Sequence, residues 1–488
     1  MCRIKMRKIT SIALSACLCL ALAGCKTDDK PTTAAADTTA AVTAEATTAE
    51  AAPTTENATT AAPTTAAPTT AAPTTAAPTT AAPTTAAPTT AAPLPEDPKY
   101  TIPTDMTEKL TTQAEKHGFT FGGCIGNNEM NNAGYKSMIA DNFASVTATN
   151  ELKAYSLLSQ KASKEDPNGM PGMNYTQADR IVKWAQENGL GVRGHVLVWD
   201  AYMTDWFFRE GYDSKGEYVD AETMKKRLEY YIDAVITHFE TEFPGVVYCW
   251  DVVNEAVGDS ASEYAAGDSC HIRTKRNGDD NIFYTKVGED YIYLSFLYAR
   301  NTVEKLGANI KLFYNDYNTF YSDKRNAIIN LVKNINSYAK NADGTDRKLC
   351  DGVGMQGYIG GYGTQAGCMN AGDIENIRLA IVKYAELDVE VHMTEVSVRN
   401  YEGDEQTVEK HARFYADLFE MLKKINSEDE LLSAHGKFTN FTSWGLCDNP
   451  KLPKNNYSYK MNGPYCGLFN EKYEKKNSFY YVYNVLQN

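Results

Sequence analysis

Between residues 99 and 488, short apolar segments typical of β-strands alternate eight times with longer segments that have helical spacing. The strand-like segments are apolar on both faces, as parallel strands covered on both sides require. Eight such units in one uninterrupted stretch predict an α/β fold, a (β/α)8 or TIM barrel in a single domain. The alternative is a doubly wound open sheet, but no Gly-x-Gly-x-x-Gly motif follows the first strand.

The periodicity also places the individual elements. The expected strands are 119–126, 145–152, 191–199, 246–256, 310–318, 352–360, 390–398 and 437–446. The expected helices include 179–188, 222–243, 290–306, 324–341, 373–387 and 407–425. Gly189, Gly245 and Gly307 closely follow three of these helices, and glycine is a common stop signal at that place.

Residues 1–25 are typical of a signal peptide. A basic start precedes the apolar run 12–23, which is shorter than the ~20 residues that span a membrane. The run ends in Leu-Ala-Gly-Cys25, which resembles the lipobox of bacterial lipoproteins. The resemblance implies that Cys25 is lipidated, and that the protein is extracellular and tethered to the bacterial cell surface by this anchor alone. An ordinary signal peptide with an incidental Cys25 is the alternative.

Residues 26–98 are rich in Ala, Thr and Pro and repeat the unit Ala-Ala-Pro-Thr-Thr, which predicts a disordered linker. The domain then covers residues 99–488. The net charge of −14, from 48 basic and 62 acidic residues, argues against nucleic acid as a partner. We expect a monomer.

The cysteines of the domain show no metal-ligand spacing, and we expect no metal site. Cys124 and Cys249 lie in strand-like segments and are expected to be buried apolar residues. Cys350 and Cys368 could form a disulfide, which the sequence does not establish.

Active sites of TIM barrels lie at the carboxyl ends of the strands. The polar and aromatic residues at these positions are Asn150, Lys153, His195, Trp199, Asn254, Glu255, Asn315, Asp316, Tyr317, Gln356, Glu395 and Trp444. Carboxylates, amides, a lysine and tryptophan faces suit a carbohydrate. Glu255 and Glu395 follow strands four and seven and could flank one glycosidic bond, where one acid protonates the leaving oxygen. Asp251 lies earlier on strand four and is expected to be a buried structural carboxylate. Glu390 lies at the start of strand seven, at the opposite end of the barrel.

Seven segments, in order, resemble glycoside hydrolase family 10, the β-1,4-xylanases. They are 193–199 (Arg-Gly-His-Val-Leu-Val-Trp), 206–213, 250–256 (Trp-Asp-Val-Val-Asn-Glu-Ala), 312–318, 352–357, 393–395 (Met-Thr-Glu) and 444–446. The resemblance implies a (β/α)8 barrel and retaining, endo-acting hydrolysis of β-1,4-xylosidic bonds in xylan by double displacement, without a cofactor.

By position, Glu255 resembles the acid/base of the family and Glu395 its nucleophile. Asn254 resembles the amide that holds the sugar 2-hydroxyl. Further substrate-binding positions are matched by Asn150, Lys153, His195 and Trp199 on the glycone side, and by Tyr317, Gln356 and Trp444 elsewhere in the site.

The chain departs from the family pattern around these residues. Thr149, Asp200, Tyr202, Tyr358, Ser397 and Leu452 stand where the family usually has other side chains. Tyr358 replaces a histidine that hydrogen-bonds the nucleophile, and we expect it to reach the pocket and limit which sugar is accepted; the alternative is that it turns away. The altered surroundings leave two other functions open, a non-catalytic protein that captures polysaccharide and a glycosidase for a different β-linked polymer.

Overall fold

The computed structural model of the chain describes residues 97–360, 367–429, 432, 436–452 and 463–488. The predictions for the signal peptide, for Cys25 and for most of the linker lie outside these residues. Among the helices that the structure describes, none is long and apolar enough to cross a membrane.

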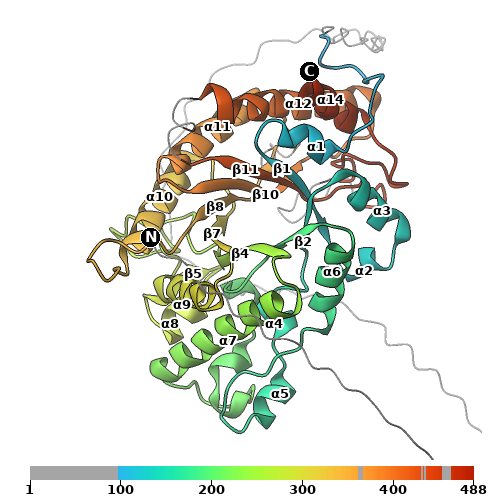
Figure 1. The fold of residues 1–488 in the computed structure, drawn as a ribbon. Coiled ribbons are helices and arrows are strands. Elements are labelled where there is room, and N and C mark those ends of the chain that lie inside the picture. Colours follow the sequence, from blue (N-terminus) through green and yellow to red (C-terminus); the bar gives the residue numbers. More distant parts are fainter. Residues whose placement is uncertain (1–96, 361–366, 430–431, 433–435, 453–462) are drawn as a thin grey trace, which may run out of the picture. The chain divides into compact units, whose positions relative to one another are not determined.

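Eight parallel strands form a closed barrel in the described part of the chain (Figure 1). They are β1 (Thr120–Ile125), β2 (Ser145–Ala148), β3 (Gly191–Gly194), β4 (Val247–Asn254), β7 (Lys311–Asp316), β8 (Gly352–Met355), β10 (Glu390–Val398) and β11 (Phe438–Ser443). Each strand pairs with the next in this order, and β11 pairs back with β1, from Thr120 opposite Asn440 to Gly123 opposite Ser443. The closed ring confirms the predicted (β/α)8 barrel and rules out the open sheet.

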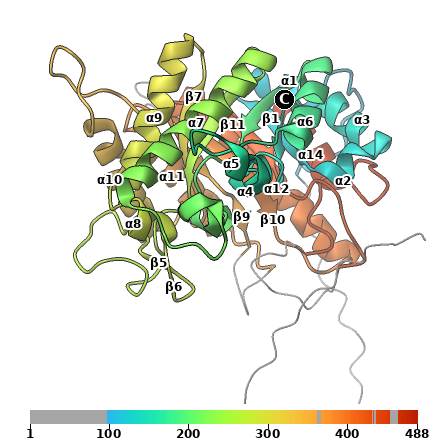
Figure 2. The same cartoon turned by 90° about the horizontal axis from the view of Figure 1, so that it is seen from below.

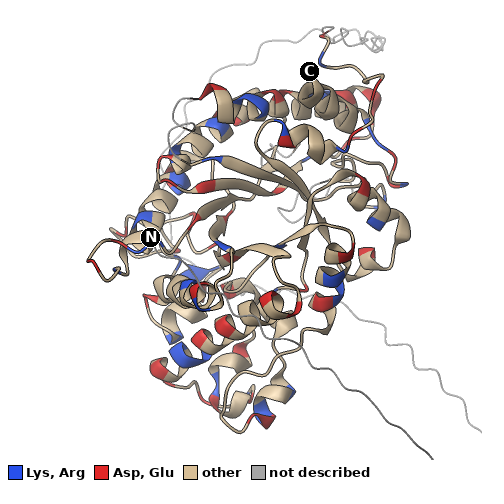
Figure 3. Cartoon of the chain, viewed as in Figure 1, with Lys and Arg blue, Asp and Glu red and all other residues tan. Residues whose placement is uncertain are grey.

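Helices surround the ring of strands (Figure 1). The longer ones are α3 (Ala133–Asn142), α6 (Thr176–Glu187), α7 (Ala221–Glu242), α9 (Tyr291–Leu306), α10 (Ser322–Ser337), α11 (Ala371–Ala385), α12 (Glu405–Glu428) and α14 (Asn477–Gln487). Shorter helices are α1 (Leu110–Glu115), α2 (Asn127–Met130), α4 (Ala154–Leu157), α5 (Gln160–Glu165) and α8 (Ile282–Lys286), with 3-10 turns η1 (Asp200–Tyr202), η2 (Asp205–Phe208) and η3 (Glu210–Tyr212). Acidic and basic residues alternate along the outer helices (Figure 3).

The sequence explains where the long helices begin and end. Asp220 precedes α7 and its carboxylate accepts a hydrogen bond from the Thr223 backbone N–H; Asp404 does the same for Thr407 at α12. Helix α9 ends at Gly307, whose φ of 63° is in the left-handed region that glycine adopts without steric cost. The six helices predicted from periodicity are all present, with ends that differ by about a turn or less.

Apolar side chains fill the space between the strands and the helices. Phe121 of β1 lies against Phe419 of α12, with ring centroids 5.4 Å apart, and against Phe441 of β11, at 4.9 Å. Aromatic pairs of this kind contribute about 0.5–1.5 kcal/mol each beyond the area that they bury. The packing holds the strands in one register and thereby fixes the positions of their carboxyl ends.

Several predicted strands are too long. Strand β2 ends at Ala148 and β3 at Gly194, so the apolar residues that follow are buried outside a regular strand, although Val198 still forms an isolated bridge with Val253 of β4. The predicted strand 352–360 is two strands, β8 and a short β9 (Tyr358–Ile359), which pairs with the end of β10. The loops that begin where these strands stop carry many of the candidate site residues.

Two features differ from the sequence predictions in kind. A short antiparallel hairpin, β5 (Lys275–Arg276) and β6 (Asp279–Asp280), interrupts the loop after β4 and projects from the same side of the barrel as β9 (Figure 2). Cys350 is a buried free thiol and Cys368 an exposed one, so the disulfide considered for this pair is not formed. Cys124 and Cys249 are buried, as predicted.

Candidate active site

Glu255 and Glu395 are both buried at the carboxyl ends of barrel strands. Glu255 directly follows β4, with 8% of its surface exposed, and Glu395 lies in β10, with 7% exposed. The φ of Glu255 is 55°, an uncommon value for a residue with a side chain. The Glu255 backbone N–H donates to the Asn315 carbonyl of β7 at 2.9 Å, which helps to hold this conformation.

A chain of side-chain amides joins the two carboxylates. Gln356 Nε2 donates to Glu255 Oε1 at 3.2 Å and to Asn254 Oδ1 at 3.1 Å. Asn315 Nδ2 donates to the same Asn254 oxygen at 2.9 Å and to Glu395 Oε1 at 3.3 Å. Asn315 has room because residue 354 is glycine; a Cβ there would lie 2.3 Å from Asn315 Oδ1. The network ties each acid, through its own amide donor, to one shared acceptor, the Asn254 side-chain oxygen.

Burial acts on the protonation of the first acid. It raises the pKa of Glu255, because the charged form is poorly solvated there. The Arg276 guanidinium lowers the pKa, whereas the carboxylates of Asp316 and Glu395 raise it further. The pKa of Glu255 therefore lies above its ordinary value. A carboxylic acid that keeps its proton toward neutral pH can act as a proton donor.

Tyr358 faces Glu395. Its hydroxyl, at the start of β9, donates to Glu395 Oε2 at 2.6 Å. Burial and the neighbouring Glu395 charge raise the pKa of Tyr358 well above its ordinary value, so the phenol remains a neutral donor. Tyr358 thus points into the site rather than away from it.

A second polar cluster lies beneath the carboxylates, inside the barrel. His195 Nδ1 is 2.9 Å from Asp251 Oδ2, and His195 Nε2 is 3.9 Å from Glu395 Oε1. Arg193 forms a close ion pair with Asp251, and its Nη1 lies 2.6 Å from His392 Nδ1. Burial raises the pKa of Asp251, but Arg193 and His195 outweigh it and hold that pKa below its usual value. Asp251 is a buried structural carboxylate, as predicted.

The comparisons agree with this geometry. The family model described as glycosyl hydrolase family 10 matches residues 109–485, well over half of the chain. The chain belongs to glycosyl hydrolase family 10.

The chain is also similar to individual proteins and to solved structures. A protein of Caldicellulosiruptor saccharolyticus is 35% identical over 309 residues, which cover 62% of this chain and 89% of that protein. Endo-1,4-beta-xylanase A of Thermotoga maritima is 35% identical over 321 residues, 64% of this chain but only 25% of that longer protein. The crystal structure of an N-terminal endo-1,4-beta-D-xylanase fragment from Clostridium thermocellum, complexed with xylohexaose, matches with 26% identity and a TM-score of 0.64, and covers 79% of this chain and 68% of that one.

Aromatic and amide side chains of this family 10 barrel form one wall beside the carboxylates. Lys153 Nζ donates to Asn150 Oδ1 at 3.2 Å and lies 5.1 Å from the Trp199 ring centroid and 4.3 Å from that of Tyr202. Trp199 and Tyr202 are in contact, with centroids 4.4 Å apart, and Tyr155 of α4 follows at 5.7 Å from Tyr202. Burial lowers the pKa of Lys153, while Glu395 and Glu255 offset part of this. The predicted residues Asn150, Lys153 and Trp199 therefore meet in space.

Two predicted residues lie farther from the carboxylates. The Tyr317 hydroxyl bonds closely to Asp259 and accepts from Arg273 Nη2 at 3.1 Å, both in the loop after β4. Trp444 is half-buried, and its ring centroid lies 6.4 Å from that of His195. Tyr317 thus belongs to the rim of the site, whereas Trp444 lies against the histidine beside Glu395.

Sequence reasoning missed Arg276, which touches Glu255. Its Nη1 donates to Glu255 Oε2 at 3.0 Å, and it forms an ion pair with Asp200. Asp200 was noted only as a departure from the family pattern. The Asn277-Gly278 pair between β5 and β6, with φ of 53° and 93°, is a strong hairpin signal that could have located this loop.

The remaining departures have different surroundings. Ser397 is buried in β10 and pairs in register with Tyr358. The Thr149 backbone N–H donates to the Ile125 carbonyl at 3.0 Å, and Leu452 donates to Asn449 at the same distance. Near Thr149, the Glu151 carboxylate accepts from the Asn127 backbone N–H at 2.7 Å.

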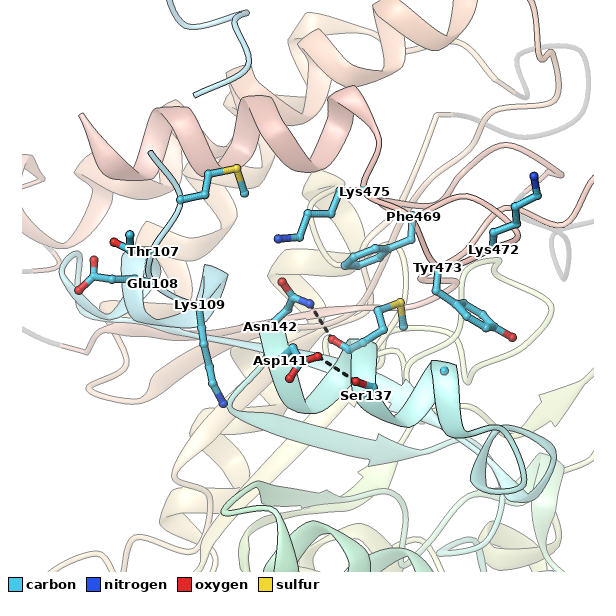
Figure 4. A pocket seen from close by; sticks show the side chains of 13 residues that line it. Thr107, Glu108, Lys109, Ser137, Asp141, Asn142, Phe469, Lys472, Tyr473 and Lys475 are labelled. Atoms are coloured by element: carbon cyan, nitrogen blue, oxygen red, sulfur yellow. Dashed lines mark hydrogen bonds between the residues drawn. The ribbon is translucent and has the colours of Figure 1, made fainter. Parts of the chain in front are cut away.

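The described residues contain no group of three or more His, Cys, Asp or Glu side chains that could hold a metal ion. A hollow of about 510 Å³ lies on the outer flank of the barrel, between the start of α1, α3 and residues 469–475 (Figure 4). None of the candidate site residues lines it; Ser137 donates to Asp141 there, within α3. The chemistry of this family 10 chain is concentrated at the strand ends instead.

Proposed function

We propose that this chain is a retaining endo-β-1,4-xylanase in which Glu395 is the nucleophile and Glu255 the acid/base. The observation that carries the proposal is the pair of buried carboxylates on different strands, joined through Asn254, Gln356 and Asn315. Retaining glycosidases use two such acids on opposite sides of the scissile bond. Family 10 is a retaining family, which agrees with this assignment.

The first step uses both acids. A Glu395 oxygen attacks the anomeric carbon, the bond from that carbon to the glycosidic oxygen breaks, and Glu255 gives its proton to the departing oxygen. In the second step Glu255 removes a proton from water, the water oxygen bonds to the anomeric carbon, and the Glu395 ester bond breaks. Burial, which raises the pKa of Glu255, supports its proton-donating role.

Buried donors beside the acids fit a sugar. Asn254 Nδ2 and Trp199 Nε1 have no hydrogen-bond acceptor among the described residues, although both are buried. Buried N–H groups are costly to leave unpaired, and sugar hydroxyls can accept from them. We assign Asn254 to the 2-hydroxyl of the sugar attacked by Glu395, and Trp199 with Lys153 and Asn150 to the glycone side.

The choice of xylan rests on the relatives. The Thermotoga maritima protein is named an endo-1,4-beta-xylanase, and the Clostridium thermocellum structure contains xylohexaose. A chain of β-1,4-linked pyranose units also suits the aromatic wall of Trp199, Tyr202 and Tyr155, because pyranose rings pack on aromatic faces. Tyr202 and Tyr155 are 37% and 41% exposed and can meet such a chain.

A reducing-sugar assay on purified protein tests the proposal. We expect activity on xylan, with products whose anomeric proton shows retained configuration in an early NMR spectrum. Inverted products would contradict double displacement. An absence of activity on every β-linked polysaccharide, with binding retained, would establish the capture protein instead.

The departures from the family pattern favour one second candidate, a glycosidase for another β-linked polymer. Tyr358 touches Glu395 and Tyr202 forms part of the aromatic wall, so two substituted residues line the site. Parallel assays on β-1,4-glucan, mannan and xylan decide between the substrates. A kcat/KM on glucan or mannan above that on xylan would replace xylan as the substrate.

We also propose that Cys25 carries the lipid that tethers the protein to the outside of a bacterial cell. The support is the Leu-Ala-Gly-Cys sequence after a short apolar run, followed by the Pro-rich segment before the barrel. Labelling with a fatty-acid analogue should mark the wild-type protein but not Cys25→Ala. Equal labelling of the wild-type and Cys25→Ala proteins, or release of both proteins into the medium, would contradict lipidation at Cys25.

A further inference from the structure

The Glu255 side chain is held by an arginine from a separate piece of chain. Arg276 Nη1 donates to Glu255 Oε2 at 3.0 Å, and Arg276 Nη2 donates to the Glu255 backbone carbonyl at the same distance. The Arg276 side chain is 19% exposed and that of Glu255 11%, so the contact is largely shielded from water. Charge-assisted hydrogen bonds in such surroundings are stronger than neutral ones.

Asp200 fixes the other edge of the same guanidinium. Arg276 Nε donates to Asp200 Oδ2 at 2.8 Å and Nη2 donates to Asp200 Oδ1 at 2.7 Å. Two parallel bonds to one carboxylate set the plane of the guanidinium, so Nη1 is directed toward Glu255. The Asp200 side chain is 8% exposed, and its partner Arg276 is thereby shared between two acids.

The hairpin that carries Arg276 is anchored independently of this contact. Asn281 Nδ2 donates to the Arg273 carbonyl at 2.9 Å, and the Asn281 backbone N–H donates to the Thr274 carbonyl at 2.8 Å. Arg273 Nε donates to the Glu255 carbonyl at 3.1 Å. The loop is therefore tied to the end of β4 by bonds that remain when the Arg276 side chain is changed.

Several charged or polar groups face Glu255. They are Arg276 of β5 with Asp200 of η1, Asp316 of β7, Glu395 of β10, Gln356 after β8, Tyr358 of β9 and Lys153 before α4. Within this set Arg276 is the cation in hydrogen-bond contact with the Glu255 carboxylate. Its fixed positive charge therefore acts most directly on the negative charge that Glu255 gains when it loses its proton.

We propose that Arg276 is a positioning residue that stabilises the carboxylate that Glu255 becomes after proton donation, and that Asp200 limits this stabilisation by sharing the guanidinium. The proposal rests on the proposed acid/base role of Glu255. Without Asp200 opposite, the undivided charge of Arg276 would favour loss of the Glu255 proton more strongly. With Asp200 opposite, the arginine orients the carboxyl group and assists its role as a base in the second step, while the acid form persists toward neutral pH.

The test is the alkaline limb of the pH profile of kcat/KM on the polysaccharide that the wild-type protein cleaves. Arg276→Met removes the cation, so the limb should move to higher pH by about one unit or more. Asp200→Asn removes the negative charge that shares Arg276, so the guanidinium favours the ionised form of Glu255 more strongly and the limb should move to lower pH. Lys275→Met removes a charge from the neighbouring hairpin position, whose nitrogen is paired loosely with Asp280, and should leave the limb unchanged.

The opposite directions of the two shifts distinguish the proposal from a merely structural role. Shifts in the same direction, or no shift in either variant at an unchanged unfolding temperature, would overturn it. If Arg276→Met does not fold, Arg276→Lys is the variant to measure. It keeps the positive charge but loses the paired bonds to Asp200. The alkaline limb should therefore stay within about half a pH unit of the wild-type limb, while kcat falls. The proposal would also be overturned if the alkaline limb of Arg276→Lys moved to higher pH by about one unit, the shift expected for Arg276→Met.

Glu255→Gln separates this inference from the proposed function. If Glu255→Gln leaves the alkaline limb in place, the acid/base assignment itself fails. If Glu255→Gln flattens the limb while Arg276→Met and Asp200→Asn do not move it, only the role of Arg276 fails. In the Glu255→Gln background, Arg276→Met should have no further effect on the pH profile with an aryl glycoside that has a good leaving group.

Discussion

Two layers of polar side chains lie inside the barrel, and their charges are paired differently. In the deeper layer, Arg193 meets Asp251 and His392, and Asp251 also meets His195. In the layer at the strand ends, Glu255 and Glu395 face each other across amides, and their nearby cation Arg276 is shared with Asp200. Asn254 Nδ2 and Trp199 Nε1 in this layer have no acceptor among the described residues.

The difference shows what each layer contributes. A buried charge without a partner is destabilising, so the deeper layer is balanced and holds His195 in place beneath Glu395. The outer layer brings two carboxyl groups and unpaired donors together, which costs stability but leaves groups available for a substrate. Four predictions follow from this contrast, and substitutions in the two layers should affect different measurements.

The largest effect is expected from Glu395→Gln. Loss of the nucleophile should lower kcat by on the order of 10⁴–10⁶-fold, while the unfolding temperature should change little, because Gln has nearly the same shape and its oxygen can still accept from Tyr358. Glu390→Gln, an acid at the other end of β10 that pairs with Lys311, is the matched control and should keep kcat. Activity of the Glu395 variant above a tenth of wild type would exclude it as nucleophile.

Glu255→Gln should lower kcat on the polysaccharide by about 10²–10⁴-fold. Burial raises the pKa of Glu255, and the acid form is the active one, so wild-type activity should fall as the pH rises through that pKa. With an aryl glycoside that needs no proton donor, the variant should form the intermediate at a pH-independent rate on the alkaline side. Glu304→Gln, which alters an exposed pair with Arg347, should retain the wild-type limb.

Asp251→Asn tests the deeper layer. It leaves Arg193 charged and buried, so the free energy of unfolding should fall by about 3–5 kcal/mol in urea titrations. The exposed Lys340–Asp346 pair offers a control, since Asp346→Asn should cost no more than about 1 kcal/mol. Equal losses in both variants would show that the buried layer is not a special source of stability.

The smallest effect is expected from Tyr358→His. The substitution keeps a donor near Glu395 but changes its size and allows it to titrate, so the ratio of kcat/KM on xylan to that on β-glucan should change by about tenfold. Tyr338→His, at an exposed position of the outer surface, should not alter the ratio. An unchanged ratio for Tyr358→His would mean that Tyr358 does not contribute to specificity.

The barrel could be predicted from the sequence because each strand is apolar on both faces and each helix has its own periodicity. The strand ends could not be predicted in this way. Val196, Leu197 and Val198 continue the apolar pattern beyond the end of β3 at Gly194, and Leu197 and Val198 still donate backbone hydrogen bonds to β4, but irregularly. An apolar pattern alone does not show where regular pairing with the neighbouring strand gives way to such an irregular segment.

The carboxylates could be placed because they directly follow strands, and strand ends converge in a barrel. Arg276 could not be placed in this way, because it lies twenty or so residues beyond β4 in a polar loop whose path depends on tertiary contacts. The Asn277-Gly278 turn shows that a hairpin is present, but not which of its side chains faces Glu255. The pairing of Arg276 with Asp200 joins two loops and has no local signal at all.

On the proposed role of Arg276, the acidity of Glu255 depends on the length of the surface hairpin that carries this arginine. Successive strand residues point to opposite faces, and the segment is anchored at Arg273 and Thr274, so an insertion or deletion of one residue between Thr274 and Arg276 would replace Arg276 at the Glu255 contact with a neighbour. Lengths of exposed turns change readily between related proteins. We therefore expect homologues that differ in the length of this hairpin to differ in working pH range, even where Glu255, Glu395 and every barrel strand are kept.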